Sequence, residues 1–140
     1  MKSKKQQKYS TKIRAIIIQE IENAELNGQM ISEALEISRM HLHRKIKVEK
    51  GISISHYILA VRLEKAQELL TETKQLITTI AYSLGFKDTS YFTRVFKKNL
   101  NCTPSQFRLM WSINKVDSSI PRGTLSNTEA FSLQRERQSG

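Results

Sequence analysis

The sequence predicts an all-α fold of seven helices, for three reasons. Apolar side chains recur at helical spacing through most of the chain up to Trp111. No segment alternates apolar and polar residues as a half-buried strand does. Short breaks that contain glycine or capping residues separate the periodic segments. We therefore expect one helical domain at residues 11–111, preceded by a basic flexible arm at 1–10 and followed by a tail at 112–140.

Three helices are predicted in the first part of this domain. Apolar residues at helical spacing indicate the first, from Ser10 to Leu26, and Asn27-Gly28 is expected to end it. The residues of this stripe are Ile13, Ile16, Ile17, Ile21 and Ala24. A short helix then runs from Met30 to Leu35. Ser38 is well placed to cap the third helix, and Gly51 to end it, because glycine readily adopts the left-handed conformation that closes many helices.

Two helices are predicted in the middle of the chain. The longer one, which Ser53 can cap, runs to about Glu72 and has an apolar stripe that we expect to face the core. The residues of this stripe are Tyr57, Leu59, Leu63, Ala66 and Leu70. The shorter helix, from Ile77 to Leu84, stops at Gly85.

The last two helices have clear start signals. Asp88 or Thr89 can cap the first of them. Thr103-Pro104 supplies an N-cap and a first-turn proline for the second, which runs through Trp111. Beyond it the composition shifts to Ser, Thr, Asn, Gln and Arg without an apolar period, so 112–140 is predicted to be a mobile tail.

One pattern occurs twice, about fifty residues apart: a short helix, a turn and a basic helix. Two sets of apolar residues hold the same core spacing, namely Ile31, Leu35, Ile37, Leu42 and Ile46, and Ile80, Leu84, Phe86, Phe92 and Phe96. Arg44 and Arg94 fall at equivalent places, with one extra residue after the second turn. This arrangement predicts two helix-turn-helix units, in which the second helix projects its outer face into the major groove of DNA.

The outer faces of the two basic helices are polar, as that role requires. Their residues are Arg39, Met40, His43, Arg44 and Lys47, and Thr89, Ser90, Thr93, Arg94 and Lys97. An arginine can donate two hydrogen bonds to one guanine, which discriminates bases by about 1–3 kcal/mol, so Arg44 and Arg94 are the leading candidate readers. Candidates for sequence-independent contacts with phosphate are Arg39, Lys47, Lys50, Lys97 and Lys98.

The long helix is expected to join the two units as a rigid spacer. At about 1.5 Å per residue it would span close to 30 Å. Successive major grooves on one face of DNA lie about 34 Å apart, and bending of the duplex can absorb a small mismatch. Two recognition helices of one monomer could therefore enter successive grooves.

The segment Leu84–Lys98, followed by Thr103–Arg108, resembles the signature of AraC/XylS-type transcription regulators. The stretches Ser38–Lys47 and Arg62–Ala66, with Leu69-Leu70, continue this resemblance, which covers about residues 12 to 109. It implies a seven-helix DNA-binding domain with two helix-turn-helix units. It also implies binding near promoters and, usually, activation of transcription through contact with RNA polymerase.

The resemblance also places the base-reading positions. They fall on Met40, His43 and Arg44 in the first recognition helix and on Thr89, Ser90, Thr93 and Arg94 in the second. The sequence departs from the family pattern at three other positions. Glu36 takes the turn position that Gly85 holds in the second copy, Leu76 replaces a polar N-cap, and Ser32 replaces the small apolar residue matched by Ala81.

Composition agrees with a polyanionic partner. The 23 lysines and arginines outnumber 13 acidic residues, which gives a net charge of +10 and a pI near 9.9. No apolar run approaches the roughly 18 residues of a membrane span, and the first residues lack the hydrophobic core of a signal peptide. With Cys102 as the single cysteine, no intrachain disulfide can form. We therefore expect a cytoplasmic protein without a membrane partner.

No catalytic or metal-binding constellation is present. His41 and His43 are two residues apart, so they point to different faces of a helix, and they lack a third ligand. Paired carboxylates, nucleophile–base sets and glycine-rich phosphate loops are also missing. We expect no enzyme activity, no cofactor and no metal.

Several alternatives stay open at this point. A helical adaptor that binds polymerase or another regulator would show only non-specific affinity for DNA. The lysine-rich arm could touch DNA or simply add solubility. The chain could work as a free-standing domain or as the output module of a longer relative, and since it holds two readers, a monomer could suffice.

Overall fold

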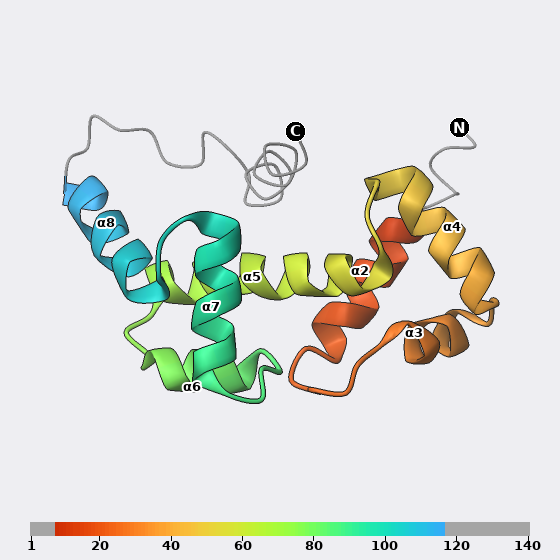
Figure 1. Cartoon of the computed structure of the whole chain (residues 1–140), viewed down its shortest axis with the longest axis horizontal. Helices are drawn as coiled ribbons and strands as arrows, with labels where there is room; N and C mark the ends of the chain where they lie inside the picture. The colour runs from red at the N-terminus through yellow and green to blue at the C-terminus, as the bar shows by residue number, and fades with distance from the viewer. Residues whose placement is uncertain (1–7, 117–140) are drawn as a thin grey trace. The chain divides into compact units, whose positions relative to one another are not determined.

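The computed structural model describes residues 8–116, which form seven α-helices and no strand (Figure 1). The predicted all-α class is therefore confirmed. The greater part of the expected basic arm and of the expected tail lies outside the described residues. The chain divides into two compact units at a boundary inside the long helix, between Val61 and Arg62.

Unit 1 contains α2 (Tyr9–Gln19), α3 (Gly28–Leu35), α4 (Arg39–Lys50) and the first part of α5 (Ile54–Glu72) (Figure 1). Each helix contributes apolar side chains to one core. Its buried members are Ile13, Ile17, Leu26, Ile31, Leu42, Ile46, Ile54, Tyr57, Ile58 and Val61. This core holds α4 by one face only, which leaves the opposite face of that helix exposed.

The connection from α2 to α3 differs from the predicted one. α2 ends at Gln19 rather than near Leu26, and Ala24 is exposed although its spacing placed it on the apolar stripe. Asn27-Gly28 starts α3 instead of ending α2, because the Asn27 side chain accepts a hydrogen bond from the Met30 amide at 3.0 Å. Asparagine serves both as a helix stop and as an N-cap, and here the second role prevails.

Gly28, the first residue of α3, lies where there is little room for a side chain. A Cβ atom at this position would lie 3.1 Å from Cγ2 of Ile54 and 3.3 Å from Nε of Arg39. The glycine therefore allows α3 to begin close to both α4 and α5 within unit 1.

Unit 2 contains the rest of α5, α6 (Ile77–Ser83), α7 (Thr89–Leu100) and α8 (Pro104–Val116). Aromatic rings form the centre of its core: Phe92 lies 4.9 Å from Phe86 and 5.8 Å from Phe96 between ring centroids, and Phe96 lies 5.6 Å from Phe107. α8 begins at the predicted proline and continues to Val116, past the expected end at Trp111.

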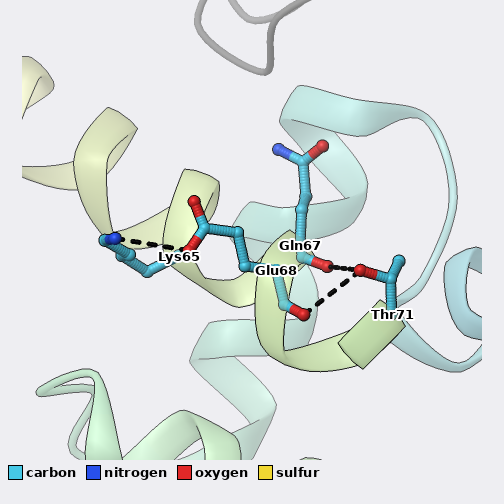
Figure 2. Close-up of polar contacts among 4 residues, drawn as sticks. All are labelled: Lys65, Gln67, Glu68 and Thr71. Atoms are coloured by element: carbon cyan, nitrogen blue, oxygen red, sulfur yellow. Dashed lines mark hydrogen bonds and ion pairs between the residues drawn. The ribbon is translucent and has the colours of Figure 1, made fainter. Parts of the chain in front are cut away.

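α5 is buried over more of its circumference than the predicted single stripe. Leu59 is only partly buried, whereas Ile58 and Val61 are buried. The helix supplies side chains to two cores along its length, so one stripe cannot describe it. At its C-terminal end Thr71 donates to the carbonyls of Gln67 and Glu68 at 3.0 and 3.1 Å (Figure 2).

Four of the predicted N-caps are formed. Ser38, Ser53, Asp88 and Thr103 each accept a hydrogen bond from the amide three residues later. Gln106 also accepts a hydrogen bond from the Thr103 amide at 2.9 Å, which completes a capping box at α8. The Leu76 side chain makes no cap at the start of α6, as the sequence indicated.

Two features are absent from the described residues. No helix within residues 8–116 is long and apolar enough to cross a membrane. The same residues contain no group of three or more His, Cys, Asp or Glu side chains that could hold a metal ion.

Candidate nucleic-acid interface

The turns of the two helix-turn-helix units have the same backbone structure. After α3, the Glu36 amide donates to the Glu33 carbonyl and the Ile37 amide to the Ser32 carbonyl, at 3.1 and 3.0 Å. After α6, Gly85 and Phe86 repeat these bonds to residues at equivalent positions, at 3.1 and 3.0 Å. Both turns are Schellman motifs, with a left-handed residue of φ 60° in the first and 87° in the second.

Glu36 therefore adopts a conformation that favours glycine. A side chain with a Cβ atom costs about 1 kcal/mol in the left-handed region. The departure from the family pattern at this position leaves the turn intact and makes it less stable than the matching turn at Gly85.

α4 presents its predicted reading residues to solvent. Leu42 and Ile46 are fully buried and fix the inner face of the helix. Met40, His43 and Arg44 are exposed on the other side, and the exposed fraction of Met40 is 62%. The phosphate candidates Arg39, Lys47 and Lys50 are exposed as well. One short helix therefore carries all the first-unit candidates on surfaces that a ligand can reach.

α7 has the same organisation in unit 2. Phe92 and Phe96 are fully buried. Ser90 and Arg94 are exposed and Thr89 and Thr93 are half-buried. The phosphate candidates Lys97 and Lys98 are exposed in the last turn. The two groups of candidates belong to different units, so each unit by itself contains one complete group.

The predicted reader in α7 has an aromatic neighbour. The Arg94 guanidinium lies 5.4 Å from the centroid of the Tyr91 ring. That ring lies 6.2 Å from the Phe86 ring, which is buried. Stacking on a ring that the core supports restricts the rotamers of the arginine before any ligand arrives. In α4 the residue equivalent to Tyr91 is His41, and its ring packs against the Tyr9 ring rather than against Arg44.

Sequence reasoning missed a carboxylate that joins α2 to α4. Glu49, in the last turn of α4, accepts hydrogen bonds from the backbone amides of Tyr9 and Ser10, at 3.2 and 2.7 Å. The residue before α2 is Lys8, whose side chain cannot accept a hydrogen bond, so α2 has no cap of its own. We call this contact the Glu49 clasp.

Glu49 is held mainly in its charged form. Burial alone would raise the pKa of this carboxyl group, but hydrogen bonds from Ser10 and Tyr9, together with nearby Lys45, outweigh burial and lower the pKa. A carboxylate at a helix N-terminus also interacts favourably with the helix dipole. The sequence offered no signal for the clasp, because the helix was expected to begin at Ser10, a residue type that can cap a helix itself.

In unit 2 a positively charged side chain contacts the C-terminal end of a helix. Arg108 of α8 donates to the carbonyls of Leu70 and Thr73 at the C-terminal end of α5, at 3.0 and 3.3 Å. A cation at this end complements the helix dipole and satisfies carbonyl groups that have no partner inside the helix. Arg108 is therefore a structural residue and does not add to the reading faces.

Cys102 lies before α8 and is partly buried. Burial raises the pKa of its thiol, so the thiolate is disfavoured. This agrees with a structural cysteine.

Comparison with known proteins identifies the fold. The family described as "Helix-turn-helix domain" matches residues 31–110, a range that contains both units' turns and recognition helices. The chain belongs to the AraC-type helix-turn-helix family. The AraC/XylS resemblance predicted from sequence and the architecture of two helix-turn-helix units are thereby confirmed.

Several AraC-type proteins are similar to this chain. The HTH-type transcriptional activator RhaS of Escherichia coli O139:H28 (strain E24377A / ETEC) is 33% identical over 84 residues, which are 60% of this chain and 30% of RhaS. The C-terminal domain of AraT, a response regulator from Geobacillus stearothermophilus, is 35% identical with a TM-score of 0.67, over 72% of this chain and 84% of that domain. The C-terminal domain of the two-component response regulator yesN from Fusobacterium nucleatum subsp. nucleatum ATCC 25586 is 33% identical with a TM-score of 0.65. The match covers 73% of this chain and 99% of that domain. The chain thus matches less than a third of the length of RhaS.

Proposed function

We propose that this chain binds double-stranded DNA at specific sequences and regulates transcription, with α4 and α7 in successive major grooves. One observation carries the proposal. Arg44 and Arg94 lie at repeat-equivalent positions on exposed faces of two helices, and each helix follows the same Schellman turn and a formed N-cap. In an AraC-type domain, such faces suit the reading of base edges.

The reading residues would divide the work between the two units. Arg44, with Met40 and His43, reads one half-site, and Arg94, with neighbouring hydroxyl groups, reads the other. The hydroxyl groups are those of Thr89, Ser90 and Thr93. Phosphate contacts come from Arg39, Lys47, Lys50, Lys97 and Lys98, and they add affinity without sequence preference.

The direction of regulation is the second part of the proposal. RhaS, which is similar to this chain, is named a transcriptional activator. We infer that this chain also activates, through contact with RNA polymerase, and that one copy suffices because it holds two reading helices. Adding the chain to a purified transcription reaction, with its DNA site upstream of a promoter, should increase transcript yield. A decrease would identify a repressor.

Selection of bound sequences from a random duplex pool at about 150 mM salt tests the DNA-binding part. Wild type should enrich two half-sites about one helical turn apart. Arg44→Ala should relax one half-site and Arg94→Ala the other. Lys74→Ala, at an exposed position outside both reading faces, is the matched control and should leave the selected sequence unchanged.

Two outcomes would contradict the proposal. Absence of enrichment with the wild-type chain would exclude specific recognition and favour the adaptor. Insertion of about half a helical turn between the half-sites should abolish tight binding, because the second helix would face away from its groove. Unchanged affinity after this insertion would exclude simultaneous reading by α4 and α7.

A further inference from the structure

A cluster of basic and aromatic side chains lies where α2 packs against α4 in unit 1. The Tyr9 ring is its centre. Nζ of Lys12 lies 5.2 Å and Nζ of Lys45 lies 5.3 Å from the centroid of this ring. The His41 ring is 5.3 Å away between centroids. We call these four residues the Tyr9 cluster. None of the four is fully buried, and Lys12 is exposed.

The cluster lies on one particular flank of α4. With about 100° between successive residues, Arg44 is opposite the buried pair Leu42 and Ile46, at the middle of the outer face. His41 and Lys45 lie to the side of Arg44 that faces α2, as their contacts with Tyr9 confirm.

The phosphate candidates of unit 1 all lie on the other flank. The same count places Arg39, Lys47 and Lys50 on the opposite side of Arg44 from Lys45. Arg39 also lies near Gly28, the first residue of α3, which identifies this flank as the α3 side. The outer face of α4 therefore has positive charge along both edges, and the Tyr9 cluster supplies the edge toward α2.

The lysines of the cluster have no direct ion-pair partner among the described residues. No described carboxylate forms an ion pair with Lys12 or Lys45 within 4.0 Å. Glu49 lies close enough to offset part of the charge of Lys45 without forming an ion pair with it, and its carboxylate oxygens accept hydrogen bonds from backbone amides of α2. Two ammonium groups held near one ring repel each other, and a bound anion close to both would offset this repulsion.

We propose that the Tyr9 cluster binds backbone phosphate of DNA on the wall of the major groove opposite to the wall that Arg39, Lys47 and Lys50 contact. A helix in a groove about 12 Å wide has a phosphate backbone along each side. The Glu49 clasp keeps the start of α2 against α4, and this contact brings Lys12 to the groove edge. The inference rests on the proposed function, because it assumes that α4 enters the groove.

A purely structural role of the two lysines, limited to their cation–π contacts with Tyr9, predicts a different result from phosphate binding. If Lys12 and Lys45 only hold Tyr9 in place, their loss should lower the thermal stability of the chain and leave the salt dependence of DNA binding unchanged. Phosphate contacts instead release counterions, at about 0.9 per contact. The salt slope therefore separates the two roles.

The experiment measures the affinity of the full chain for its selected duplex between 50 and 200 mM salt. In the Lys12→Gln/Lys45→Gln double variant, the slope of log affinity against log salt should fall by about 1.8, which makes the affinity change over this range about tenfold smaller. The selected base sequence should stay the same. Lys12→Arg/Lys45→Arg should keep the wild-type slope, and Lys74→Gln is the control for loss of an exposed lysine elsewhere.

The outcomes separate this inference from the function on which it rests. A wild-type chain that does not prefer the selected duplex over a scrambled one would overturn both. A wild type that does prefer it, with an unchanged slope in the double variant, would overturn only the phosphate site. If circular dichroism shows that the double variant is unfolded, Lys12→Gln alone, at an exposed position, should still lower the slope by about 0.9.

Discussion

Removal of the charge of Glu49 should loosen α2 from α4. This carboxylate is the cap of α2, although it belongs to a helix about forty residues further along the chain. Glu49→Gln keeps the shape of the side chain and one acceptor but removes the negative charge. Glu49→Ala removes the cap completely.

The contacts of Glu49 set the size of the effect. Loss of an N-cap acceptor costs about 0.5–2 kcal/mol, and loss of a favourable charge at a helix N-terminus costs about 0.3–1 kcal/mol. Glu49 is only partly buried, so solvent screens the second contribution. We expect Glu49→Ala to lower the free energy of unfolding of unit 1 by about 1–2 kcal/mol and Glu49→Gln by about 0.5–1 kcal/mol.

The effect should depend on pH in a defined direction. The pKa of Glu49 is lower in the folded chain than in the unfolded chain, mainly because hydrogen bonds and Lys45 outweigh burial. Its stabilising contribution is therefore fully present above the unfolded pKa, about 4.3, and is lost as the pH falls through the folded pKa. Protonated Glu49 resembles glutamine, so wild type and Glu49→Gln should become equally stable at low pH.

Urea unfolding followed by circular dichroism, from pH 7 to pH 3, measures this difference. Hydrogen exchange of amides in α2 assigns it to unit 1. Glu68→Gln is the control, because Glu68 forms only a partly buried pair with Lys65 at 3.3 Å on the same helix, which should contribute little (Figure 2). Equal stability of wild type and Glu49→Ala at pH 7 would refute the clasp. A Glu49→Gln difference that stays constant down to pH 3 would refute the role of charge.

Three further predictions follow from the turns, from α8 and from α7. Glu36→Gly should raise the free energy of unfolding and Gly85→Ala should lower it, each by about 1 kcal/mol, because both positions have positive φ. Thermal melts measure both changes, and lower stability of Glu36→Gly would contradict backbone strain at Glu36. Arg108→Met should lower the unfolding free energy by about 1–3 kcal/mol, measured by urea titration, and an unchanged value would show that its two hydrogen bonds contribute nothing. Tyr91→Leu should reduce the preference of Arg94 for its base several-fold, and Tyr91→Phe should keep that preference, because only the second variant retains a ring beside Arg94. Competition binding with altered duplexes measures the preference, and equal effects of the two variants would exclude positioning of Arg94 by the ring.

The sequence by itself determined most of the helix starts and the exposed faces of α4 and α7. Ser38, Asp88 and Thr103 cap their helices as predicted, since a cap joins a side chain to an amide only three residues away. The repeat also predicted the left-handed turn at Glu36, by comparison with Gly85. Local hydrogen bonds and helical periodicity depend on neighbours in sequence, so these features can be derived before any tertiary structure is known.

Tertiary structure decided the contacts between helices. The Glu49 clasp, the Arg108 contacts and the pairing of Tyr9 with Lys45 each join residues more than thirty positions apart. The local sequence left the role of Asn27 open between ending one helix and capping the next, and in the structure its side chain caps α3. Contacts between helices form only when apolar burial has brought particular helix ends together, and a linear pattern does not specify which ends will meet.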